Sequence, residues 1–270
     1  MTAVPPSRSH AERMAAAAES FRRFVPEAEP ERVASSFTRR LGPLGAFAYE
    51  TVGAMWDRPD LDRRDRSLFI VTTLATQARD DELVAHTQIG IRHGLTPDEI
   101  VEILPHVASL AGFPAAMAAA RQIDEGLRQA AGVDRLAERD GITAASDAER
   151  DAAAAEAWAA RTGHPVEQAE AAFETRYADL GALGELHVRW NLGQIWSRTV
   201  LSGRDRSIVA ISVLVTIGAM PALAEQVAAA RHLGLDGAEI REIVSHLGLY
   251  VGLPRATEAM MIVNEVLGAP

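Results

Sequence analysis

The order of hydrophobic and polar positions along the chain predicts helices. Residues 67–78 are apolar or small on nearly all sides, which is typical of a helix buried at the centre of a bundle. A strand over residues 68–71 is the alternative, but the length of the apolar run favours a helix. Residues 208–217 are similarly apolar.

Helix signals follow this central segment. A helix over residues 81–93 should end at Gly94, because glycine adopts the positive φ that closes a last turn. Thr96, Pro97 and Glu99 then have the order of an N-cap, a first helical residue and a capping-box glutamate. Residues 236–239 predict a second helix start of the same kind. Further helices should follow the breaks at residues 112–114 and 252–254, and one helix ahead of residue 67 should carry Trp56.

The same sequence pattern occurs twice, 140 positions apart. Arg64-Asp65-Arg66-Ser67 recurs at residues 204–207 without a gap. The register also aligns further pairs: Trp56 with Trp196, Leu74 with Leu214, Leu83 with Leu223, His106 with His246, and Pro114 with Pro254. We therefore predict an all-α chain of two tandem modules, residues 1–135 and 136–270, with an Ala-rich, partly helical linker over about residues 130–155.

Composition excludes several classes of protein. The net charge of −10 argues against a nucleic-acid partner, because such binding needs many Lys and Arg residues. Cysteine is absent, which excludes disulfides, thiolate metal sites and cysteine nucleophiles. The first residues have no apolar targeting segment, and no run is long enough to span a membrane. We expect a cytoplasmic protein without a membrane partner.

Two candidate catalytic residues, Glu82 and His86, are one helical turn apart. Residues spaced by four share a helix face, and a carboxylate beside an imidazole can tune it as a general acid or base. An exposed pair without function is the alternative. His106 lies in an apolar stretch, where it is either catalytic or a structural histidine bonded to the backbone.

Arginines and aromatic residues supply candidate substrate contacts. Arg63 and Arg66 could bind a substrate carboxylate, although such a charged run also suits a solvated helix start. Trp56 and Tyr49 are candidate pocket walls or core anchors. Glu82, His86 and His106 form no established metal-binding motif, so we expect no metal.

The sequence resembles the carboxymuconolactone decarboxylase family. The resemblance rests on Tyr49–Trp56, Arg58–Leu68, Glu82-Leu83, His86, Thr96–Ile100, His106–Ala108 and Gly112–Ala116, and it returns more weakly over about residues 190–267. It implies the all-α AhpD-like fold, a small-molecule substrate and no cofactor. It also implies a homo-oligomer, in which three two-module chains would form an assembly that resembles a hexamer of single modules. The AhpD branch uses a CxxC pair, which this chain lacks.

The resemblance implies a decarboxylase that acts on a carboxylated lactone or another enolisable acid. Loss of CO₂ leaves a carbanion, so the enzyme must stabilise an oxyanion and deliver a proton. His86 with Glu82 would handle the proton, and His106 or an arginine would stabilise the charge. In the second module Gln226 and Ala222 replace His86 and Glu82, so that copy should lack the pair. A secondary-metabolite cyclase or isomerase, and a non-catalytic binding or assembly protein, are the alternatives.

Overall fold

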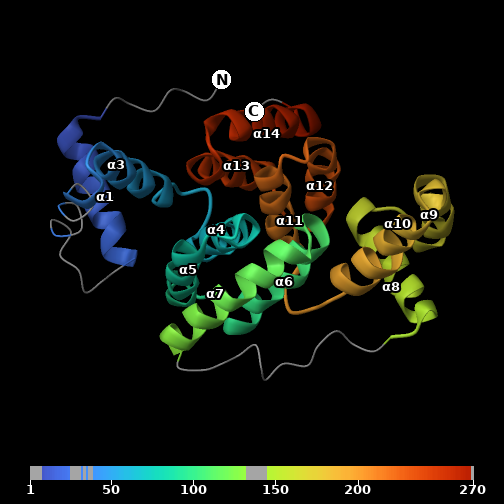
Figure 1. The fold of residues 1–270 in the computed structure, drawn as a ribbon. Helices are drawn as coiled ribbons and strands as arrows, with labels where there is room; N and C mark the ends of the chain where they lie inside the picture. The colour runs from blue at the N-terminus through green and yellow to red at the C-terminus, as the bar shows by residue number, and fades with distance from the viewer. Residues whose placement is uncertain (1–7, 25–31, 33–34, 36–38, 132–144, 269–270) are drawn as a thin grey trace.

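The computed structural model describes residues 8–24, 32, 35, 39–131 and 145–268. Every regular element in these residues is a helix, as the apolar pattern predicted (Figure 1). The helices of the first half are α1 (His10–Phe24), α3 (Pro43–Trp56), α4 (Arg63–Gln77), α5 (Asp80–Arg92), α6 (Pro97–Ala111) and α7 (Phe113–Ala131).

The second half repeats this series with a more broken entry. It begins with α8 (Asp147–Thr162), η1 (Val166–Gln168), α9 (Ala169–Tyr177), η2 (Ala178–Leu180), α10 (Ala182–Glu185) and η3 (Leu186–Trp196). It continues with α11 (Gly203–Ile217), α12 (Met220–His232), α13 (Gly237–Val251) and α14 (Leu253–Leu267). The segment η3 is a π-helix, whereas its counterpart α3 is α-helical.

The duplication is confirmed at the level of single residues. Helices α4, α5 and α6 begin and end 140 positions before α11, α12 and α13. The predicted linker contains the end of α7 and the start of α8, while residues 132–144, including the boundary placed between residues 135 and 136, lie outside the described residues.

The predicted central helices lie side by side in the middle of the molecule. Helix α4 packs against α11, and residues 65–75 of α4 are all buried. One hydrophobic core extends through both modules. Helices α5, α6 and α7 cover α4, while α12, α13 and α14 cover α11 (Figure 1).

The predicted helix ends are confirmed. Thr96 and Asp236 each cap a helix within a complete capping box, closed by Glu99 and Glu239. Gly94 and Gly112 have φ values of 99° and 94°, which explains why glycine stands at both breaks. Among the described residues, no helix combines the length and apolar character that a membrane crossing requires.

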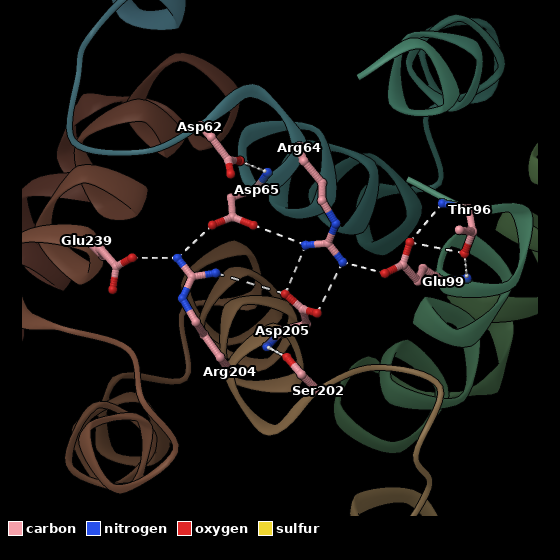
Figure 2. Close-up of polar contacts among 9 residues, drawn as sticks. All are labelled: Asp62, Arg64, Asp65, Thr96, Glu99, Ser202, Arg204, Asp205 and Glu239. Atoms are coloured by element: carbon pink, nitrogen blue, oxygen red, sulfur yellow. Dashed lines mark hydrogen bonds and ion pairs between the residues drawn. The ribbon is translucent and has the colours of Figure 1, made fainter. Parts of the chain in front are cut away.

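A paired ion cluster joins the two central helices (Figure 2). Arg64 of α4 donates to both carboxylate oxygens of Asp205 of α11, at 3.1 Å each. In the reverse direction, Arg204 lies 2.6 Å from the Asp65 carboxylate. Each arginine is also 2.5 Å from a capping-box glutamate, Glu99 for Arg64 and Glu239 for Arg204. The repeated Arg-Asp-Arg-Ser segments therefore hold the modules together. Arg66 and Arg206, which follow Asp65 and Asp205 in the sequence, point away from this ion cluster.

Candidate active site between the modules

His86 of the first module lies beside aromatic residues from both modules. Its ring is nearly parallel to that of Trp56, with centroids 6.5 Å apart and an interplanar angle of 13°. The ring of Tyr250, on α13 of the second module, is 6.1 Å away. The His86 side chain is half-buried, and its Nδ1 atom is buried without a hydrogen-bond partner among the described residues. One ring nitrogen is thus held inside the protein with its bonding capacity unused.

His246, also from α13, completes this cluster of rings. It lies 5.3 Å from Trp56, 5.1 Å from Phe69 and 6.0 Å from Tyr250. Each histidine therefore contacts the same two rings, Trp56 and Tyr250. Since Trp56 and His86 come from one module and the other two residues from its partner module, we define these four residues as the inter-module ring cluster.

A buried arginine fixes the tautomer of His246. Arg66 is fully buried, and its Nη1 lies 2.9 Å from Nδ1 of His246 and 2.8 Å from a carboxylate oxygen of Glu242. A guanidinium can only donate hydrogen bonds, so Nδ1 of the neutral ring accepts and the ring proton is on Nε2. That Nε2 is buried without a partner among the described residues. His246 consequently presents an unused N–H donor within the ring cluster.

Burial keeps both histidines neutral. Desolvation lowers the pKa of His86 to about 4, and the charge of nearby His93 adds to the effect. Desolvation, together with the Arg66 cation, holds the pKa of His246 well below its usual range. For Tyr250, burial raises the pKa of the hydroxyl, against a hydrogen bond from Trp56 that lowers it. The cluster is therefore uncharged near neutral pH.

His93 forms the edge of the cluster on the first-module side. Its ring centroid is 5.4 Å from that of Trp56, and its Nδ1 is 2.8 Å from the hydroxyl of Ser67. Burial lowers its pKa to about 4, with Arg63 the next contributor.

Glu82 does not join His86, in contrast to the prediction from their spacing. Its side chain is exposed and makes no hydrogen bond or ion pair with the described residues. The two residues share a helix turn, but His86 turns inward against Trp56, whereas Glu82 in the first turn of α5 faces solvent. A spacing of four residues places two side chains on the same side of a helix, but it does not determine whether each side chain is buried or exposed.

His106 also lies away from His86. It packs on Trp196 in the way that His246 packs on Trp56. Its ring packs edge-on against Trp196 at 5.8 Å. The repeat register had aligned His106 with His246, and the structure shows that each of these histidines crosses over to the tryptophan of the other module. The histidine that accompanies His86 is thus His246.

The remaining predicted residues have structural partners. Arg63 lies 2.5 Å from Asp57, and both Nη atoms of Arg66 are engaged, with Nη2 donating to the Arg58 carbonyl at 2.7 Å. Tyr49 is buried and stacks on Phe21 of α1 at 4.7 Å. Trp56 is in the ring cluster. No group of three or more carboxylate or imidazole side chains in the described part of the chain is arranged to hold a metal ion.

His246, Tyr250 and Glu242 were missed because they belong to the module that has no histidine at the position of His86. A signal was available: His106 and His246 align in the repeat, so a crossed pairing of modules would have placed His246 beside the first-module site. Surface hollows of about 340 and 420 Å³ lie over α8 to η3, and His86 lines neither of them.

The fold and this ring cluster define an all-α protein of duplicated helical modules with an uncharged histidine site between them. Residues 46–125 and 182–265 both match the carboxymuconolactone decarboxylase family. Because the two matches cover more than half of the chain, the protein belongs to that family.

Two relatives carry names that state an activity. A 4-carboxymuconolactone decarboxylase of Acinetobacter baylyi is 38% identical over 82 residues, which are 30% of this chain and 59% of the relative. A nitrosuccinic acid decarboxylase of Metarhizium robertsii is 30% identical over 83 residues, 31% of this chain and 58% of the relative. The chain thus spans a little under three fifths of the length of each relative.

Proposed function

We propose that the protein is a cofactor-independent carboxy-lyase that decarboxylates a small, enolisable carboxylic acid at the inter-module ring cluster. The observation that carries this proposal is the presence of two neutral histidines with unused ring nitrogens against the same pair of aromatic rings. The names of the two relatives support decarboxylation of a carboxylated lactone or of a short nitro acid.

The proposed chemistry assigns a separate task to each histidine. When the carbon–carbon bond to the carboxylate breaks, its electron pair passes into the adjacent unsaturated group and CO₂ leaves. His246 Nε2–H donates a hydrogen bond to the oxygen on which the charge develops. His86 delivers a proton to the carbon.

Substrate binding would prepare His86 for this step. An anionic substrate beside the ring raises the pKa of the imidazole, because an opposite charge favours the protonated form. The ring would then take up a proton with the substrate and return it to the product. Arg66 acts through His246 as a positioning residue, since it holds the tautomer that leaves Nε2–H free. Glu82 and His106, also expected to be catalytic from the sequence, would have at most an indirect part.

The test is release of CO₂ from 4-carboxymuconolactone and from nitrosuccinate, compared for the wild type and His86→Gln. General acid–base catalysis contributes roughly 10²- to 10⁴-fold, so we expect His86→Gln to lower kcat by about 100-fold or more. His232→Gln, an exposed histidine on the repeat counterpart of α5, is the matched control and should keep wild-type kcat. Equal turnover by wild type and His86→Gln would refute the assignment.

We also propose that the chain forms a homo-oligomer, a trimer of two-module chains. The first residues of the equivalent helices α7 and α14 are large and apolar, yet Phe113 is 72% and Leu253 is 70% exposed. Met117 and Met261 on the same helices are 64% and 68% exposed. Apolar side chains repeated at one position of both modules are suited to packing against another copy.

A further inference from the structure

A cluster around Trp196 is the repeat counterpart of the inter-module ring cluster, with Gln226 in place of His86 and an additional arginine, Arg161. Arg161 of α8 lies over the Trp196 ring, with its central carbon 3.8 Å from the ring centroid. Its Nη2 donates to Oε1 of Gln226 at 3.0 Å, the residue that stands where the first module has His86. Arg206 lies 6.0 Å from the same ring centroid, and His106 packs against it edge-on.

Four nitrogen atoms in this cluster are buried without a hydrogen-bond partner among the described residues. They are Nη1 of Arg161, Nε of Arg206, Nε2 of Gln226 and Nε2 of His106. Three of them always carry hydrogen, and a neutral imidazole can donate from Nε2 as well. Unpaired buried donors are costly, so four of them around one ring indicate a site built for acceptor atoms.

The charges of the cluster also favour the binding of an anion. Beside the inter-module ring cluster, the positive charge of buried Arg66 is neutralised by the Glu242 carboxylate at 2.8 Å. The equivalent carboxylate around Trp196 is Glu102, and both of its oxygens bind Arg198. Asp205, which lies near Arg206, is bound by Arg64. Glu225, which lies near Arg161, is bound by Arg176. Within the part of the chain that the structure describes, Arg161 and Arg206 therefore have no carboxylate in hydrogen-bond contact, and burial lowers the pKa of Arg161 to about 10.

We propose that Arg161, Arg206, Gln226 and His106 form a second ligand site around Trp196, and that this site binds a small carboxylate anion. An ionised carboxylate offers about four lone-pair positions and no donor, which matches the four unused nitrogen atoms. Guanidinium groups bind carboxylates with strong, charge-assisted hydrogen bonds. Gln226 cannot exchange a proton as His86 can, so the site binds its anion without turning it over.

A surface hollow lies close to this cluster. Arg198, which holds Glu102 beside His106, also lines a surface hollow of about 420 Å³ together with Gln194 and Ser197. These residues flank Trp196 in the sequence. In the proposed site, an anion of the size of acetate or succinate would enter from this side.

The test is isothermal titration calorimetry of the whole chain with sodium acetate and sodium succinate at matched ionic strength, with inorganic phosphate as a third ligand. We expect carboxylate binding by the wild type and a loss of at least about tenfold in affinity for Arg161→Met, because a charge-assisted hydrogen bond is removed. Arg150→Met is the matched control, since Arg150 also lies on α8 over a tryptophan ring, at 4.3 Å from Trp190, and it should bind as the wild type does.

A second variant keeps the proposal testable if Arg161→Met fails to fold. Gln226→Glu places a carboxylate within reach of Arg161, so it should raise the melting temperature and abolish carboxylate binding. His86→Gln should leave the affinity unchanged, which separates this site from the proposed active site. Absence of carboxylate binding by the wild type, equal binding by Gln226→Glu, loss of binding in His86→Gln, or tighter binding of phosphate than of either carboxylate would overturn the proposal.

Discussion

Single histidines couple the stability of the protein to pH. In the unfolded chain a histidine takes up a proton near its ordinary pKa of 6.5, whereas burial lowers the pKa of folded His86 and His93 to about 4 and that of His106 to about 3. Between these values the unfolded state binds more protons than the folded state. The contribution to stability is therefore fully present above about pH 6.5 and is lost as the pH falls towards 4.

We predict that the melting temperature of the wild type decreases from pH 7 to pH 4.5, and that it decreases less in His86→Gln, which lacks one of the histidines whose pKa is lowered in the folded state. Circular dichroism at a series of pH values measures both slopes. A melting temperature that stays constant over this range, or the same slope in both proteins, would show that the histidines are not buried in their neutral form.

Residue identity allowed part of the inter-module ring cluster to be predicted. His86 and Trp56 could be selected because an imidazole and a tryptophan stand out in an apolar helical pattern, and the structure brings them together. His246 and Tyr250 were not selected, because their approach to His86 depends on how the two modules cross. Glu82 shows the converse: it has the right spacing to touch His86, but solvation keeps its carboxylate at the surface.

Ion pairs join the central helices α4 and α11. In the sequence, the residues that form them were visible only as a repeated Arg-Asp-Arg-Ser motif. Asp205 has a side chain only 10% exposed and accepts two hydrogen bonds from Arg64 across the α4–α11 contact. Removing one partner of such a pair leaves a poorly solvated charge, which is strongly destabilising.

We predict that Asp205→Asn lowers the free energy of unfolding by about 2 kcal/mol. Urea unfolding followed by circular dichroism gives this value. Asp151→Asn, which removes the partner of Arg189 in an exposed pair, should change stability much less. The ion cluster would have no role in joining the modules if both variants unfolded at the same urea concentration.

Helix boundaries were the most predictable feature at this scale. Local signals set them, such as the Thr96 capping box and the positive φ of Gly94. The entry of the second module was less predictable. The π-helix η3 and the short α9 and α10 have no strong apolar period, and η3 packs against α8 in a tertiary contact that the sequence pattern does not show.

The whole molecule is a pseudo-symmetric pair of modules built on one core. Because α4 and α11 pack on each other at its centre, each half contributes residues to the site of the other half. An internal repeat predicts the duplication but not this exchange of residues, since offset alone does not specify how two copies pack. One of the two clusters contains His86, and the other contains Gln226 at the equivalent position together with Arg161.

At this scale we predict that the chain is a trimer in solution and that Phe113→Glu combined with Leu253→Glu releases monomers, because both side chains are exposed at equivalent positions. Light scattering coupled to size-exclusion chromatography measures the mass. A monomeric wild type, or an unchanged mass in the double variant, would contradict this assembly.

The most direct test of a catalytic site shared between modules is the kcat of His246→Gln for CO₂ release, measured beside the wild type and the exposed-histidine control His232→Gln. His246 lies in the half that lacks a counterpart of His86, so only the crossed packing gives it a role in the same reaction. We predict that kcat falls by about 100-fold, in the range of a lost oxyanion donor, while the control is unaffected. Wild-type kcat in a folded His246→Gln protein would contradict the account.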